Sequence, residues 1–431
     1  MPKTANDDPE QTENHFLRFS HKAVSLLELE CVNQSIRGLP FEVLSADISG
    51  AIISCTPDIA KRLISLLGGS YKIARVIGND VEDSVKQLPL PDAPKFEWTV
   101  SGYNCEEDAI QSCREEVKEL LKKSGLGKSK FVPPSIESAA DKVEDQEEEQ
   151  GVDGREERDK RISEIKSSEL ARRIFDSENQ GIDVVLHGGV GSFGPFLAYT
   201  VGVSDVDGFE RRDFKRPYQD PKITLGARVA RILCNLAAGS HRALLCDPFC
   251  GLGTILQEAL VIGHPVLGID KRSEYVFKAR SNLEWVAREY SLPRSRIVKV
   301  LRYDSQRMDE LPMQRCDCIA SEPILLPTFK DNPTQEEASA SIRSAGAVYE
   351  RFLQACPRVL ASKSSRIALI SPIVVDSGGR SISLDLGESA RKAGLRAYWP
   401  DTSKNRFDYP IKIETTKKKT VQRGINLFSP A

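Results

Sequence analysis

The 431-residue chain has no uninterrupted apolar run near the roughly 18 residues that a membrane-spanning helix needs. Its first residues are polar and acidic, and they lack the basic start and apolar stretch of an export signal. We therefore expect a soluble, cytoplasmic protein. At roughly 100–200 residues per domain, the length predicts two to four domains.

Recognised metal-ligand and phosphate-binding spacings are also missing. The sequence has no Cys-x-x-Cys pair, no complete Gly-x-x-x-x-Gly-Lys-Ser/Thr loop for a nucleoside triphosphate, and only five scattered histidines. Ten cysteines are too few for a disulfide scaffold, and Cys55, Cys234 and Cys246 lie in apolar runs where a free thiol behaves as a small hydrophobe. These absences predict reduced cysteines and no metal site.

Charge is distributed unevenly along the chain, although the net charge is only −2. Residues 136–159 hold eleven acidic and three basic side chains, and residues 210–431 hold 36 lysines and arginines against 24 aspartates and glutamates. A basic excess of this kind suits a surface that faces phosphates, but it also occurs in domains that bind no nucleic acid.

The N-terminal half is predicted to contain two small α/β units. After a disordered tail over 1–13, residues 14–80 alternate in the order βαββαβ, which describes a ferredoxin-like unit. A proline-containing linker over 81–94 leads to a second unit over 94–205, whose acidic segment 136–159 is too polar to order itself. A further helix is expected near 163–175, followed by two strands.

The C-terminal half, from about Leu225, alternates strictly between strands and helices. This pattern predicts a doubly wound α/β domain over 225–431, joined to the preceding unit by a connector over 206–224. At its end, candidate strands near 409–414 and 421–428 flank Lys417, Lys418 and Lys419, which predicts a basic antiparallel hairpin at the sheet edge.

The sharpest motif is Leu244-Leu-Cys-Asp-Pro-Phe-Cys-Gly-Leu-Gly-Thr254, in which a strand leads into a glycine loop and then a helix. Such a loop lets the backbone approach a nucleotide-like cofactor. Asp247 at the strand end would repel a pyrophosphate but attract the ammonium of a methionine moiety. S-adenosylmethionine therefore fits better than NAD or ATP, and the candidate binding residues are Asp247, Pro248, Cys250, Gly251, Gly253 and Thr254.

Two further acids follow the next two strands, Asp270 after Val266–Ile269 and Asp304 after Val300–Tyr303. The first is placed to accept hydrogen bonds from ribose hydroxyls, and the second from the adenine amino group. A lone aspartate at a strand end is more often a turn former or helix cap. Three in succession favour a cofactor site.

The fourth strand ends in Ser321-Glu-Pro-Ile324. Methyltransferases that act on exocyclic amines commonly place Asn/Asp-Pro-Pro-aromatic here, so that an oxygen acceptor aims the amine lone pair at the methyl group. Ser321, Glu322 and Pro323 are thus the catalytic candidates. The alternative is a strand exit with no catalytic role.

The chain resembles the THUMP-domain tRNA guanosine N2-methyltransferases that modify guanosine ten. The similarity includes Asp247–Thr254, which resembles that family's cofactor motif, and Arg211–Lys222 with Leu225–Arg231, which resemble its connector. The resemblance implies a THUMP-like RNA-binding domain over 94–205 and a Rossmann-like class I methyltransferase domain over 225–431. The motif at Ser321–Ile324 departs from the family's Asp-Pro-Pro-Tyr.

The first hypothesis is therefore an S-adenosylmethionine-dependent methyltransferase acting on a guanine N2 of tRNA. The alternatives are an RNA-binding protein whose methyltransferase domain has lost its chemistry, and an amine-directed DNA methyltransferase. A small activating protein partner is left open. The side chains expected to contact RNA are Lys122, Lys123, Lys128, Lys130, Arg216, Lys417, Lys418 and Lys419.

Overall fold

The computed structural model describes residues 11–35, 39–133, 181–220, 225–312, 315–323, 326, 329, 331–400, 409–413 and 420–431. In these residues no helix is long and apolar enough to cross a membrane. The chain divides into two compact units. Unit 1 comprises residues 1–20, 40–65 and 70–204, and unit 2 comprises residues 21–39, 66–69 and 205–431.

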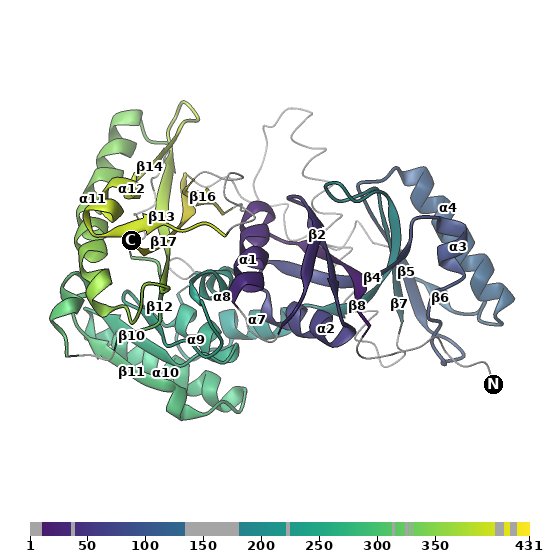
Figure 1. Ribbon diagram of the computed structural model, residues 1–431, viewed down its shortest axis with the longest axis horizontal. Helices are drawn as coiled ribbons and strands as arrows, with labels where there is room; N and C mark the ends of the chain where they lie inside the picture. The colour runs from purple at the N-terminus through teal and green to yellow at the C-terminus, as the bar shows by residue number, and fades with distance from the viewer. Residues whose placement is uncertain are drawn as a thin grey trace. The chain divides into compact units, whose positions relative to one another are not determined.

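Unit 1 is built on an eight-stranded sheet of order β2-β3-β1-β4-β8-β7-β5-β6 (Figure 1). Its strands are β1 (Glu13–Phe19), β2 (Glu42–Ala46), β3 (Gly50–Cys55), β4 (Ser70–Gly78), β5 (Glu97–Tyr103), β6 (Lys130–Phe131), β7 (Ile182–His187) and β8 (Phe196–Val203). Its helices are α2 (Pro57–Leu66), α3 (Val81–Val85) and α4 (Glu107–Lys123). The strands expected in two separate units, over 14–80 and 94–205, thus share one sheet.

A buried ion pair and two hydrogen bonds to the same carboxylate connect four strands of this sheet. Asp183 on β7 accepts hydrogen bonds from Lys72 Nζ on β4 at 2.7 Å, Ser101 Oγ on β5 at 2.6 Å and Thr200 Oγ1 on β8 at 2.5 Å. Both charged side chains are almost fully excluded from water. Although burial lowers the pKa of Lys72, Asp183 and Tyr103 together outweigh that effect and the pKa is raised.

Unit 2 is a doubly wound α/β structure, as predicted. Its sheet follows the order β11-β10-β9-β12-β13-β17-β15, and β14 and β16 pair with β13 and β17. Its strands are β9 (Leu245–Asp247), β10 (Val266–Asp270), β11 (Ile297–Arg302), β12 (Cys318–Ser321), β13 (Arg366–Val375), β14 (Ser381–Ser383), β15 (Leu395–Ala397), β16 (Ile411–Lys412) and β17 (Val421–Pro430). Strands β9 to β13 are parallel, and β17 is antiparallel to β13.

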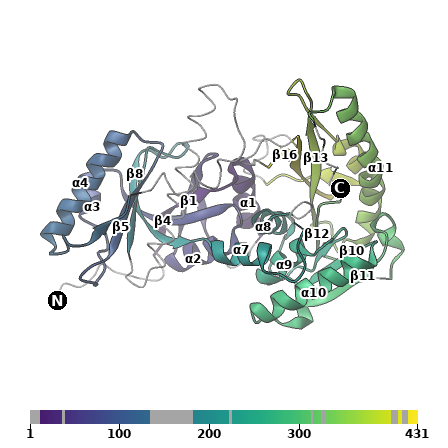
Figure 2. The ribbon, with the colours of Figure 1, turned by 180° about the vertical axis from the view of Figure 1, so that it is seen from behind.

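Helices cover both faces of this sheet. Its α-helices are α1 (Lys22–Ser35), α7 (Val206–Phe214), α8 (Ala227–Ala237), α9 (Thr254–Val261), α10 (Ser273–Glu289), α11 (Gln335–Val359) and α12 (Leu386–Lys392). Two 3-10 turns, η1 (Arg294–Arg296) and η2 (Ser305–Glu310), complete it. Apolar side chains of α1, α8, α9 and α10 form the core on one face, and those of η2, α11 and α12 form the core on the other. Figure 2 shows α8 and α11 on opposite sides of β13.

Several sequence expectations need correction. The linker over 81–94 begins with helix α3, which Asp80 caps by accepting a hydrogen bond from Asp83 N. The alternation of strands and helices predicts a helix over 345–360, but α11 begins ten residues earlier, at Gln335, because Thr334 and Glu337 form a capping box. The predicted hairpin pairs β16 with β17, but β17 lies inside the sheet, between β13 and β15.

The first helix of the predicted βαββαβ unit, expected over residues 24–36, is present as α1, but it packs with unit 2 rather than with the sheet of unit 1. Glu28 explains this attachment. Its carboxylate, fully buried, accepts hydrogen bonds from Gly68 N at 2.9 Å, Gly69 N at 2.8 Å and Asn235 Nδ2 of α8 at 2.6 Å. The tail before residue 11, the acidic segment 136–159 and the helix near 163–175 lie outside the described residues.

Candidate functional site

The glycine loop after β9 has the backbone shape that its sequence predicts. Gly251 and Gly253 adopt positive φ angles of 50° and 82°, which favour glycine over other residues. Cys250 N donates to Ile269 O of β10 at 2.9 Å and fixes the loop against the neighbouring strand. A Cβ atom on Gly251 would meet no protein atom within 4 Å, so a side chain there would occupy the open space beside the loop.

That open space belongs to a cavity of about 480 Å³ at the carboxyl ends of the parallel strands. Strand order reverses between β9 and β12, and ligands of doubly wound sheets bind at such a switch point. The cavity lies wholly within unit 2, and its lining residues are Leu225, Asp247, Phe249, Cys250, Gly251, Leu252, Thr254, Ile255, Asp270, Lys271, Arg272, Tyr275, Asp304, Ser305, Gln306, Glu322, Pro323 and Val348.

Asp247 is a buried carboxyl group at the wall of this cavity. Its Oδ1 accepts hydrogen bonds from Ser321 Oγ at 2.5 Å and Phe249 N at 3.1 Å. Burial raises the pKa of Asp247 to about 7, and the charges of Asp270 and Glu322 add to the rise against these hydrogen bonds. The described residues thus give Asp247 no cationic partner, and a bound cation would stabilise its ionised form.

Asp270, the last residue of β10, and Asp304, which follows β11, line the same cavity. Asp270 Oδ2 accepts from Gly251 N at 3.1 Å and its Oδ1 from Arg272 N at 2.9 Å, so the carboxylate supports the glycine loop. Asp304 caps η2 by accepting from Gln306 N at 3.0 Å. Asp304 is therefore a helix cap, which was the alternative to a cofactor contact in the sequence, and it also lines the cavity. Of the predicted binding residues, Pro248 and Gly253 do not line the cavity.

Glu322 does not point freely into water, and it pairs with a residue that sequence reasoning missed. Arg423 on β17 donates from Nε to Glu322 Oε1 at 2.6 Å and from Nη2 to Oε2 at 3.3 Å. The Glu322 side chain is 11% exposed, and it lines the cavity beside Pro323. Arg423 is 101 residues away in the chain, so only the pairing of β13 with β17 brings it near β12.

The structure corrects the expectation for Arg216. This side chain is 2% exposed, and its Nη1 donates to Thr254 Oγ1 at 2.7 Å. Burial lowers the pKa of the guanidinium. Arg216 therefore supports the first turn of α9 beside the cavity, and it is not available on a surface that faces phosphates.

The four lysines predicted to contact RNA in unit 1, Lys122, Lys123, Lys128 and Lys130, are all exposed at the end of α4 and in the following segment. Lys122 pairs with Glu119 at 2.5 Å and Lys130 with Glu97 at 3.0 Å, so part of this charge is neutralised. Lys417, Lys418 and Lys419 lie outside the described residues.

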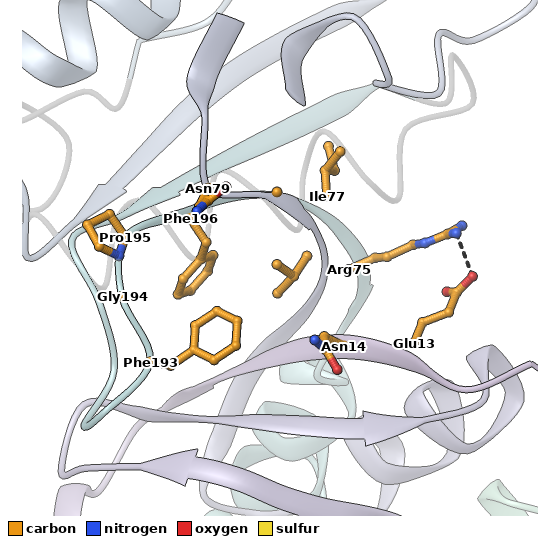
Figure 3. Close-up of a pocket in the computed structure, with 11 residues that line it drawn as sticks. Glu13, Asn14, Arg75, Ile77, Asn79, Phe193, Gly194, Pro195 and Phe196 are labelled. Carbon is orange, nitrogen blue, oxygen red and sulfur yellow. Dashed lines mark ion pairs between the residues drawn. The ribbon is translucent and has the colours of Figure 1, made fainter. Parts of the chain in front are cut away.

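Unit 1 has a cavity of its own, of about 580 Å³, shown in Figure 3. The rings of Phe193 and Phe196 face it, and its two charged lining residues, Arg75 and Glu13, form an ion pair at 2.5 Å. It offers no cluster of acids comparable with the cavity of unit 2. Among the described residues no group of three His, Cys, Asp or Glu side chains could hold a metal ion, and all ten cysteines are free.

Comparison with known proteins identifies the type of domain that holds this site. Residues 214–323 match the model of the UPF0020 family, an RMKL-like methyltransferase domain. Over 116 residues the chain is 36% identical to the tRNA (guanine(10)-N2)-dimethyltransferase of Pyrococcus abyssi, covering 26% of this chain and 32% of that enzyme. Over 133 residues it is 31% identical to the Methanocaldococcus jannaschii enzyme of the same name, covering 30% and 36%.

These alignments span about a third of the length of the curated relatives. Structural similarity extends further. The crystal structure of TrmN from Thermus thermophilus aligns over 97% of this chain and 100% of its own length, with a TM-score of 0.51 and 16% sequence identity. The predicted class I methyltransferase fold is thus confirmed, and the predicted resemblance to tRNA guanine N2-methyltransferases is confirmed for the aligned segments.

Proposed function

We propose that this chain, which contains a methyltransferase domain, is an S-adenosylmethionine-dependent enzyme that methylates the exocyclic N2 of a guanosine in tRNA, in the cytoplasm. The observation that carries the proposal is the set of acids around one cavity. Asp247, Asp270, Asp304 and Glu322 come from the ends of four neighbouring parallel strands, and the glycine loop closes the same space.

The residues of this cavity fit S-adenosylmethionine. Asp247, buried without a cationic partner among the described residues, suits the α-ammonium of the methionine part. Asp270 suits the ribose hydroxyls, and Asp304 the adenine amino group. When bound, this cofactor supplies an activated methyl group on a sulfonium. The protein then has to position the acceptor amine, and no metal is needed for the reaction.

Glu322 is the residue we assign to positioning the amine. An ionised carboxylate has about four lone-pair positions. Glu322 can therefore accept hydrogen bonds from Arg423 and still accept one from the N–H of the amine. Arg423 restricts the side chain to one orientation, and a fixed acceptor keeps the amine lone pair directed at the reacting methyl carbon. Ser321 has a different role, because its hydroxyl donates to Asp247.

The proposal of tRNA as substrate is supported by the names of the two archaeal relatives and by the charge of the chain. Both relatives are tRNA (guanine(10)-N2)-dimethyltransferases. The basic excess over residues 210–431 and the exposed lysines of unit 1 suit a polyanionic partner. Transfer of labelled methyl to tRNA transcripts, followed by nucleoside mass spectrometry, tests the substrate and the methylated atom together.

The affinity for S-adenosylmethionine should depend on pH through Asp247. Because the pKa of this carboxyl is about 7 and the ammonium needs its ionised form, binding should be about tenfold weaker at pH 6 than at pH 7.5. Calorimetric titration at both pH values measures this. Asp247→Asn should bind weakly at both pH values and lose the dependence. A wild-type affinity that does not change between pH 6 and 7.5 would remove Asp247 from the ammonium site.

Asp270→Ala should weaken cofactor binding by about ten- to a hundredfold, since a charge-assisted hydrogen bond contributes roughly 1.5–3 kcal/mol. The carboxylate also supports Gly251 and Arg272, so Asp270→Asn serves as the control that keeps its shape and removes its charge. Calorimetric titration of both variants, with thermal unfolding to check the fold, gives the answer. An Asp270→Ala protein that binds like the wild type would contradict the ribose assignment.

A further inference from the structure

A partly exposed cluster of aromatic and basic side chains borders the cavity of unit 2. Tyr218 and Phe277 form an edge-to-face pair with ring centroids 5.9 Å apart. Arg272 lies over the ring of Tyr275 at 3.5 Å, and Lys278 Nζ lies 5.8 Å from the Tyr275 ring and 6.0 Å from the Tyr218 ring. We call these five residues the aromatic platform.

The platform presents an apolar ring to water. Phe277 is 60% exposed, whereas its neighbours on α10, Val276 and Ala279, are buried in the core. Phe277 therefore projects from the side of the helix that does not pack on the sheet. A phenylalanine that is mostly in water contributes little to folding, because the apolar area it removes from water is small.

The platform is held rigidly relative to the glycine loop. Asn282, fully buried on α10, accepts from Tyr218 N at 3.0 Å and donates to Tyr218 O at 3.0 Å. The same amide nitrogen donates to Leu252 O in the loop at 2.9 Å. Tyr218 is thus fixed through its backbone, so the platform is preorganised beside the cavity.

We propose that the aromatic platform stacks unpaired bases of the RNA that flank the target nucleotide. The proposal rests on the proposed function for the identity of the substrate. Base stacking on aromatic rings, with cations beside them for the phosphates, is the usual recognition of single-stranded RNA. Arg272 and Tyr275 also line the cavity, so an RNA strand on the platform would approach the site of methyl transfer.

The charges around Phe277 favour RNA over a protein partner. Lys271 and Arg272 are exposed just before α10, and the Arg272 side chain is 59% exposed. Glu274 is paired with Lys278, and Asp270 Oδ1 lies 3.9 Å from Arg272. Aromatic rings separated by cations match the alternation of base and phosphate, whereas the centre of a protein interface is depleted of lysine.

Phe277→Ala tests the platform in the full-length protein. Stacking contributes roughly 1–3 kcal/mol per base, so the KM for tRNA should rise by about 5- to 100-fold while kcat and the Kd for S-adenosylmethionine stay unchanged. Phe214→Ala is the matched control, because Phe214 is 58% exposed on α7 and lies outside the platform. It should leave the KM for tRNA unchanged.

A spectroscopic arm separates stacking from charge. The Phe277→Trp variant has more tryptophan fluorescence than the wild type. Titration with an eight-nucleotide oligoadenylate should quench this additional fluorescence. An unchanged KM for Phe277→Ala together with no quenching would overturn the platform, and would point to a protein partner at this surface. If the wild type transfers no methyl to tRNA but the variant is quenched, the proposed function fails and the platform stands.

Discussion

Replacing Glu322 by glutamine should lower the single-turnover rate of methyl transfer to tRNA by about 10²-fold or more, while the affinity for S-adenosylmethionine is retained. The carboxylate is a stronger acceptor than an amide, and its contacts with the amine become important in the transition state. The amide also breaks the ion pair with Arg423, which in the wild type fixes the Glu322 side chain at the end of β12. Rapid-quench measurements with saturating enzyme and cofactor give the rate.

Two further variants make this result specific. Arg423→Lys keeps a cation near Glu322 and should retain more of the rate than Arg423→Met, which leaves the carboxylate without its partner. Ser321→Ala should change the cofactor affinity more than the rate, because the hydroxyl donates to Asp247. Equal single-turnover rates in the wild type and Glu322→Gln would remove Glu322 from catalysis.

Replacing Asp183 by leucine should lower the free energy of unfolding of unit 1 by about 3–5 kcal/mol, since it leaves a buried ammonium without its counter-charge. Lys72 is fully buried, and Asp183 is its partner at 2.7 Å. The change also removes the acceptor for Ser101 and Thr200 on neighbouring strands. Hydrogen exchange measured by mass spectrometry should show faster exchange in β4 and β7 by about 10²-fold or more.

The control for this effect is to remove both charges together. Asp183→Leu combined with Lys72→Met should recover most of the lost stability, because apolar side chains of similar size can replace a buried ion pair. Lys86→Ala removes an exposed ion pair with Glu82, which water screens, and should leave the free energy of unfolding almost unchanged. Unchanged exchange in β7 of the Asp183→Leu protein would show that the ion pair does not stabilise the sheet.

Strong periodicity made most of the fold predictable from the sequence. The sequence predicts a helix over 254–261 and a strand over 196–203, and α9 and β8 have these bounds because turn residues and glycines delimit their apolar runs. The sequence did not predict α7 and α8, since Arg211–Lys222 and Leu225–Arg231 indicated only a connector and no secondary structure was assigned to them. The packing of α1 with α8 could not be predicted either, because it depends on the hydrogen bond from Asn235 to Glu28, which are 207 residues apart in the sequence.

The site was predicted where its residues are local in the sequence. Asp247, Gly251 and Asp270 stand at strand ends within one stretch of chain, so the parallel topology alone gathers them around the cavity. Arg423 and the platform residue Tyr218 come from distant segments, and no motif marks either of them. The charge of Arg216 suggested a surface contact, yet burial and the hydrogen bond to Thr254 make it a support of the first turn of α9.

The central claim is tRNA guanine N2 methylation, and the most direct test uses an unmodified transcript. The full-length protein, labelled S-adenosylmethionine and a tRNA transcript would be incubated, digested to nucleosides and analysed by mass spectrometry. The account predicts labelled N2-methylguanosine or N2,N2-dimethylguanosine in the wild type and about 10²-fold less in Glu322→Gln. Label in another nucleoside would contradict the assigned target. No label in a wild-type protein that still binds the transcript would instead support an RNA-binding protein that has lost this chemistry.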